Sequence, residues 1–169
     1  MLSSPYIIKS RPAAGPLLTD IARMQACLIM KAVLFDFGGT LDADGLSWGD
    51  RFYPLYREAG LAVSREAFTK SFFKSDDALP ARFALKGLSL ERTLQLQVSC
   101  VLEDLAPKQR ELEMAITARF LADCRRVFDR NRPLLGRLKA KYRLGIVSNF
   151  YGNLAEVLES EGLSEYFET

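Results

Sequence analysis

Two short apolar runs, far apart in the chain, constrain the fold most. The first, KAVLFDF, ends near an acidic residue and is followed by Gly38 and Gly39, and the second, YRLGIVSNF, ends in polar residues. An apolar run of this length that is bounded by turn residues is typical of a buried strand. The segment NRPLLGRLKAKY, before the second run, predicts a helix with Pro133 in its first turn, where a missing amide donor is harmless. A helix between two buried strands favours a right-handed crossover and parallel pairing.

The stretch between the two runs, from about residue 48 to residue 127, has a helical pattern throughout. Apolar residues recur at a spacing of three to four in RFYPLYREAGL, SREAFTKSFFK, LSLERTLQLQVSCVLEDL and KQRELEMAITARFLADC. A further helix, GNLAEVLESEGL, follows the second run, with Gly162 as a plausible cap near its end. The sequence therefore predicts an α/β fold, with a doubly wound parallel-sheet core and an all-helical insertion after the first strand.

These patterns divide the chain into three parts. Residues 1–29 show weak periodicity and are punctuated by prolines, so we expect a loosely ordered extension. Residues 30–46 and 128–169 are predicted to form the core, and residues 47–127 to form the helical insertion. Because the core segments contain only two evident strands, we expect this core to be incomplete at its C-terminal end.

The composition narrows the chemistry, because the chain has no histidine. A Ser-His-Asp triad, a Cys-His pair and a His-ligated zinc or haem site are therefore excluded. Any reaction must use carboxylates, hydroxyls, amines, backbone groups or a hard metal ion held by oxygen. The formal net charge of +2 does not suggest nucleic-acid binding. No apolar run is long enough to span a bilayer, so we expect no membrane partner.

The cysteines favour a reducing compartment. Cys27, Cys100 and Cys124 are odd in number, widely spaced and without a CxxC pair. They are expected to be small buried hydrophobic residues rather than disulfide partners. We therefore predict a cytoplasmic protein.

Small and polar residues follow both predicted strands, where ligands bind in open parallel sheets. Asp36, followed by Gly38 and Gly39, suits a phosphate, since the glycines expose backbone amides and permit close approach. The Asp36 carboxylate could attack phosphorus or hold a magnesium ion. Ser148 and Asn149 stand at the second strand end. Each group also has a plainer interpretation, in which Asp36 caps a turn and Ser148 and Asn149 begin a helix.

The segment VLFDFGGTLD resembles the first motif of the haloacid-dehalogenase (HAD) superfamily, in which Asp-x-Asp-x-Thr follows the first strand. GIVSN resembles the second motif, a strand that ends in Ser or Thr, and the helical stretch between them is similar to the family's helical cap. The resemblance covers nearly all of residues 30–169. It implies a Rossmann-like core and magnesium-dependent hydrolysis of a small phosphomonoester through an aspartyl-phosphate intermediate.

The resemblance implies a role for each residue that matches a motif. Asp36 corresponds to the catalytic nucleophile and a magnesium ligand, and the Gly38 carbonyl to a second magnesium ligand. Thr40 corresponds to a residue that supports the catalytic loop, and Ser148 to the hydroxyl that hydrogen-bonds the phosphoryl group. The residues predicted to bind phosphate and substrate follow the two strands: Gly39, Ser148 and Asn149.

The chain departs from the family pattern in two ways. Gly38 stands where the family's phosphatases usually have a second Asp as general acid and base, and Asp42 and Asp44 lie just downstream as candidate substitutes. No segment matches the third and fourth motifs, so we expect a truncated form with absent or impaired catalysis. Two alternatives remain open: a catalytically inactive relative that serves as a binding or regulatory module, and a metal-independent haloacid dehalogenase.

Overall fold

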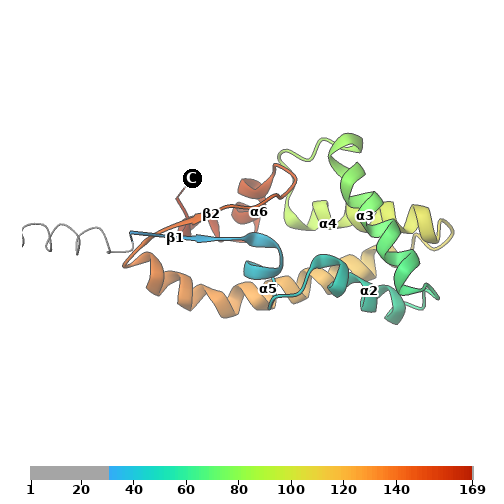
Figure 1. Ribbon diagram of the computed structural model, residues 1–169, viewed down its shortest axis with the longest axis horizontal. Helices are drawn as coiled ribbons and strands as arrows, with labels where there is room; N and C mark the ends of the chain where they lie inside the picture. Colours follow the sequence, from blue (N-terminus) through green and yellow to red (C-terminus); the bar gives the residue numbers. More distant parts are fainter. Residues whose placement is uncertain (1–30, 169) are drawn as a thin grey trace, which may run out of the picture. The chain divides into compact units, whose positions relative to one another are not determined.

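The structure, a computed structural model, describes residues 31–168 (Figure 1). The predictions for residues 1–29, including Cys27, lie outside the described residues. The elements in chain order are β1 (Ala32–Phe35), η1 (Phe37–Leu41), α2 (Trp48–Glu58), α3 (Arg65–Arg82), α4 (Leu90–Leu105), α5 (Leu112–Lys139), β2 (Arg143–Ile146), α6 (Leu154–Ser160) and η2 (Ser164–Tyr166).

The prediction of an α/β fold with a doubly wound parallel sheet is wrong. Within residues 31–168 the structure is 64% helical, and its sheet consists of two short parallel strands. A doubly wound core needs a larger sheet with helices on both faces. Here one face of the sheet packs into the core through Val33, Phe35 and Leu144, whereas Leu34 and Val147 are 67% and 66% exposed. Two four-residue strands bury too little surface to organise the fold, and the helices form most of the core.

The two strands pair in parallel, as the helix between them predicted. Phe35 of β1 lies opposite Ile146 of β2, and the Val147 N–H donates a hydrogen bond of 2.9 Å to the Phe35 carbonyl. Parallel strands have their carboxyl ends at the same edge of a sheet. The residues that follow the strands, Asp36 after β1 and Ser148 after β2, therefore lie at one edge.

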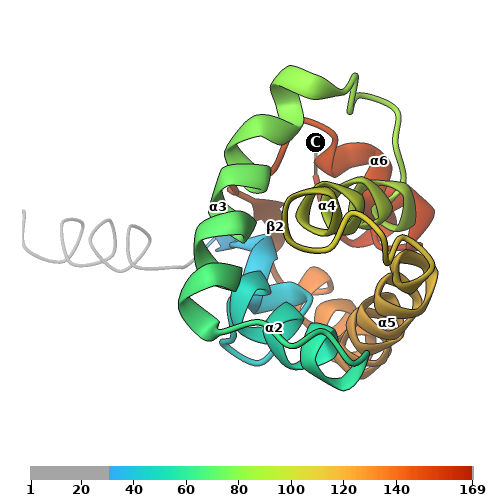
Figure 2. The same cartoon turned by 90° about the vertical axis from the view of Figure 1, so that its right-hand side faces the viewer.

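The helical pattern predicted for residues 48–127 is confirmed. Helix α3 packs on α4, α4 on α5, α5 on α2 and α2 on α3, around the common centre that Figure 2 shows. Along α4 the side chains of Leu90, Leu94 and Val98 recur every four residues and are fully buried. The rings of Phe52 and Phe120 stack with centroids 3.9 Å apart and join α2 to α5. None of the helices that the structure describes is both long enough and apolar enough to cross a bilayer.

Local capping signals set several helix ends. Gly162 caps α6 as predicted, with a φ of +62°, and the Leu163 N–H donates a hydrogen bond of 2.7 Å to the Leu158 carbonyl. At the start of α2, α3 and α4 a serine hydroxyl accepts a hydrogen bond from the backbone N–H three residues further on. These serines are Ser47, Ser64 and Ser89.

The prediction that a new helix begins with the segment NRPLLGRLKAKY, with Pro133 in its first turn, is wrong. Helix α5 continues through this segment and holds Pro133 in its interior. A proline there lacks the N–H that would bond the carbonyl of Asp129. Phe128 and Leu135 are buried on either side of the proline, and this packing outweighs the lost hydrogen bond. The predicted boundary between insertion and core therefore falls inside one helix.

The cysteine prediction is confirmed at the two positions that the structure describes. Cys100 and Cys124 are buried and free of disulfides. Burial raises the pKa of both thiols, to about 12 for Cys124, although nearby arginines oppose the shift. Both therefore stay protonated near neutral pH and act as small apolar residues.

Candidate functional site

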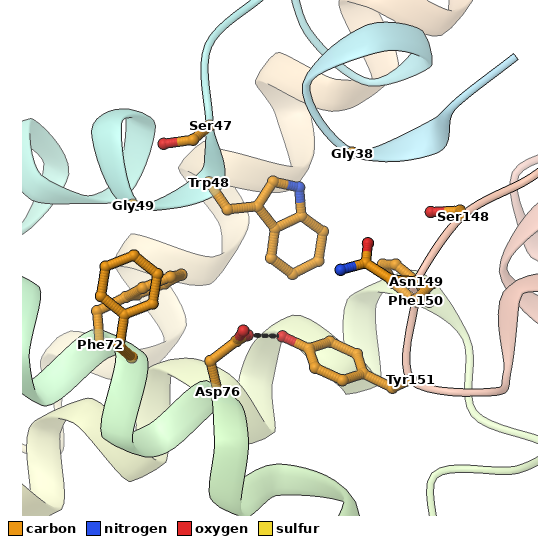
Figure 3. A pocket seen from close by; sticks show the side chains of 11 residues that line it. Gly38, Ser47, Trp48, Gly49, Phe72, Asp76, Ser148, Asn149, Phe150 and Tyr151 are labelled. Atoms are coloured by element: carbon orange, nitrogen blue, oxygen red, sulfur yellow. Dashed lines mark hydrogen bonds between the residues drawn. The ribbon is translucent and has the colours of Figure 1, made fainter.

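A pocket of about 230 Å³ lies where the loops after β1 and β2 meet α2 and α3 (Figure 3). Three of the residues predicted from the two motifs line it: Gly38, Ser148 and Asn149. Gly38 follows β1, whereas Ser148 and Asn149 follow β2. The parallel pairing of the strands thus brings together segments that are remote in the sequence.

The other predicted site residues do not line this pocket. Asp36 is exposed directly after β1, two positions before Gly38, and Thr40 is exposed as well. The Gly39 N–H, predicted to face a phosphate, instead donates a hydrogen bond of 2.6 Å to the Asp42 carboxylate. Asp36 therefore adjoins the pocket through the loop, while the Gly39 amide is engaged within it.

The two glycines of this loop differ in what their backbone requires. Gly39 has a φ of +80°, and a Cβ there would lie 3.1 Å from the Leu46 carbonyl oxygen, so the position favours glycine. Gly38 has a φ of −68° and a ψ of 122°, which any residue adopts. A Cβ on Gly38 would meet no atom within 4 Å. Position 38 can therefore accept a side chain, which the loop itself does not need.

Asp42, a candidate substitute for the missing acid, is a buried anchor of the loop. Its side chain is fully buried and lies outside the pocket lining. The Trp48 indole N–H and the Arg51 guanidinium donate hydrogen bonds of 2.6 Å and 2.8 Å to its Oδ2, while the Gly39 N–H bonds Oδ1. Arg51 also contacts the Cys124 thiol, at 3.1 Å. These partners fix Trp48, which is a wall of the pocket, and leave Asp42 no route to a substrate.

Asp44, the other candidate, is engaged at the surface. Its carboxylate accepts hydrogen bonds from Arg130, one of them 2.9 Å long. The bond from Arg130 is the main reason that the pKa of Asp44 is lowered. A carboxyl group with a lowered pKa is ionised at neutral pH and is a poor proton donor. Neither downstream acid therefore replaces the side chain that Gly38 lacks.

The sequence did not single out the acid that does lie in the pocket, Asp76 of α3. Its carboxylate accepts a hydrogen bond from the hydroxyl of Tyr151, which follows β2 (Figure 3). Burial raises the pKa of Asp76, the hydrogen bond from Tyr151 opposes this, and the charge of Asp77 raises it further. Burial likewise raises the pKa of Tyr151. The spacing of four places Phe72 and Asp76 on one helix face, but it does not indicate that this face meets the loop after β2.

The predicted magnesium ligands form a small set. Among residues 31–168 no group of three acidic or thiol side chains lies close enough together to hold a metal ion. The ligands that the motif implies are the Asp36 carboxylate and the Gly38 carbonyl. Magnesium usually keeps several waters and takes one or two carboxylates together with substrate phosphate. These two donors alone would leave most positions around such an ion to substrate and water.

The comparisons with known proteins add no assignment. The chain matches no family model and no curated protein. The roles of the site residues therefore rest on the motif residues themselves and on the pocket in which three of them meet.

Replacing Asp42 by Asn should lower the free energy of unfolding by about 3–5 kcal/mol, because Arg51 would keep a buried charge without its partner. The Arg51 side chain is only 11% exposed. Urea unfolding followed by circular dichroism measures the change. Asp44→Asn is the matched control, and its exposed pair should leave the urea midpoint unchanged. Equal stability of the Asp42 variant and the unaltered chain would contradict the anchoring role.

Replacing Asp76 by Asn should change how stability depends on pH. A carboxyl whose pKa is raised in the folded state binds its proton more tightly there, so it favours folding at low pH. That contribution is lost as the pH rises from about 4 through the raised pKa. We expect the variant to gain stability relative to the unaltered chain between acidic and neutral pH, as measured by urea unfolding at both. A difference that is independent of pH would show that Asp76 is not desolvated.

Proposed function

We propose that the chain hydrolyses small phosphomonoesters by HAD-type chemistry, with Asp36 as nucleophile. The observation that supports this most is the meeting of Gly38, from the first motif, with Ser148 and Asn149, from the second, in one pocket. A hydroxyl and an amide there supply hydrogen-bond donors of the kind that bind phosphoryl oxygens. The aromatic walls leave room for a small organic group beside them.

In the proposed reaction an Asp36 oxygen attacks phosphorus, and the bond from phosphorus to the leaving-group oxygen breaks. Water then attacks the aspartyl phosphate, which releases inorganic phosphate and restores the carboxylate. Asp36 is exposed at the end of β1, so both substrate and water can reach it. The Ser148 hydroxyl donates to a phosphoryl oxygen, and the Asn149 amide helps to orient the substrate.

The phosphate charge needs a counter-charge that the pocket walls do not supply. Among the described residues, no lysine or arginine lines the pocket. A magnesium ion held by the Asp36 carboxylate and the Gly38 carbonyl would offset the charges of the phosphate and of the attacking carboxylate. Asp36 thus has two tasks, to attack phosphorus and to help hold the ion.

The proposed site has no general acid at position 38 or just downstream to protonate the leaving group. Gly38 has no side chain, Asp42 is buried among its donors, and Asp44 is paired with Arg130. None of these three positions can supply a proton, so in the proposed reaction the leaving oxygen takes its proton from water. General acid help is typically worth about 10²- to 10⁴-fold in rate, so we expect slow turnover and a preference for good leaving groups.

Asp36→Asn should abolish magnesium-dependent release of phosphate from p-nitrophenyl phosphate, because an amide is a poor nucleophile. Phosphate release is measured directly, with Asp44→Asn as the control that keeps the activity of the unaltered chain. Activity in the Asp36 variant would rule out the assigned nucleophile.

Halide release from a 2-haloacid without metal would favour the dehalogenase instead. A folded chain that does neither but binds a protein partner would favour the inactive binding module.

Gly38→Asp should raise the turnover of an alkyl phosphomonoester by about 10²- to 10⁴-fold, because it restores the acid that the site lacks. The backbone at position 38 accepts a side chain without strain, and the space around it is open. Gly38→Asn is the matched control, of nearly the same size but unable to donate a carboxylic proton. A folded Gly38→Asp chain that is no faster than the Asn variant would count against the whole mechanism.

A further inference from the structure

The end of the pocket opposite Gly38 combines aromatic walls with a single acid. In Figure 3 the side chains of Trp48, Phe72 and Tyr151 face the same space as the carboxylate of Asp76. Trp48 comes from the start of α2, Phe72 and Asp76 from α3, and Tyr151 from the loop after β2. As far as the described residues form the lining, it contains no lysine or arginine to neutralise the acid.

The Asp76 carboxylate has fewer partners than its charge calls for. Tyr151 provides the one side-chain hydrogen bond that the structure shows to it within residues 31–168, whereas an ionised carboxylate can accept about four. Lys74 and Arg82, basic residues of the same helix, form ion pairs with acids of α4 instead. Burial raises the pKa of Asp76, which reflects the loss of water around its ionised form. A cation in the pocket would compensate this loss.

We propose that this end of the pocket binds an alkylammonium group, and that the substrate is a small phosphomonoester that carries such a group. The identity of the phosphoryl half rests on the proposed function. The ammonium half rests on Asp76 and on the aromatic walls alone, so it can be tested without phosphate.

Charge decides which ligand chemistry fits this end. Aromatic faces attract cations electrostatically, and a partly desolvated carboxylate next to them adds a direct ion pair. A second anionic group would be repelled by Asp76, and a neutral apolar group would bury the carboxylate without compensation. The phosphoryl group is then directed to the other end, where Ser148 and Asn149 lie. The pocket thus orients a ligand that is positive at one end and negative at the other.

The chain carries its own reporter for this site. Trp48 is its only tryptophan, and it lines the pocket. Its intrinsic fluorescence therefore reports on ligands that enter, with no label and no catalytic turnover. Its indole N–H is held by Asp42, outside the pocket, so the ring is already fixed before a ligand arrives.

The experiment titrates the full chain with choline, which has a quaternary ammonium group, and with 3,3-dimethyl-1-butanol, its uncharged carbon analogue. We expect a saturable change in Trp48 fluorescence with choline and at least about tenfold weaker binding of the analogue. Asp76→Asn should weaken choline binding by about tenfold. Asp77→Asn, the neighbouring exposed acid outside the lining, is the matched control and should bind choline as the unaltered chain does. Isothermal titration calorimetry repeats the measurement without reliance on fluorescence.

Three results would overturn the proposal: equal binding of choline and the analogue, choline binding that Asp76→Asn leaves intact, or no choline binding by either method. The comparison of the two ligands uses the unaltered chain, so it stands even if a variant fails to fold. Choline binding through Asp76 in a chain that releases no phosphate would contradict the proposed hydrolysis and support the ammonium site. Phosphate release without choline binding would support the hydrolysis and contradict the ammonium site.

Discussion

The pocket depends on a carboxylate that lies outside it. Asp42 accepts hydrogen bonds from the loop amide of Gly39, from the indole of Trp48 and from Arg51, and so ties the loop after β1 to the start of α2. Arg51 extends this network to α5, because it contacts Cys124 and lies over the ring of Phe120 with 4.1 Å to the centroid. A buried charge needs all its partners, so the loop, α2 and α5 must be in place together. The position of the aromatic wall of the pocket follows from this one network.

The parts of the fold that could be predicted were those that local sequence determines. The helical spacing between residues 48 and 127 and the glycine cap at Gly162 each leave a signal within a few turns of chain, and the helix directly before β2 indicated its parallel pairing with β1. The size of the sheet leaves no such local signal, because it depends on which strands meet in space. The doubly wound core was inferred from two apolar runs alone. Pro133 misled for a similar reason, since burial of Phe128 and Leu135 keeps α5 helical against the local preference of proline.

The residues of the candidate site likewise fall into those that the sequence predicted and those that it did not. Gly38, Ser148 and Asn149 were predictable because they directly follow apolar strands, and parallel pairing brings such positions together. Asp76 and Tyr151 were not, because their contact joins residues 75 positions apart and arises only when α3 packs beside the loop after β2. Closeness in sequence to Gly38 also did not indicate which acids lie in the pocket. Asp42 and Asp44 follow Gly38 within a few residues, yet a buried network holds one and a surface arginine the other.

The continuity of α5 sets how the pocket can admit a ligand. This helix packs against α2 and α4 and also against β2 and η1, so it supports the α2 wall of the pocket and the two segments whose loops line it. A segment joined to its neighbours by two flexible hinges can swing open as a rigid lid, but here one unbroken helix, α5, links the helices of residues 48–127 to β2. A wide swing would have to bend that rod and separate its buried contacts. Entry is therefore expected through small local shifts of the loop before α2 and of the side chains at the rim, of which Phe73 is 59% exposed. Continuity of α5 thus favours a pocket that keeps its shape as a ligand enters.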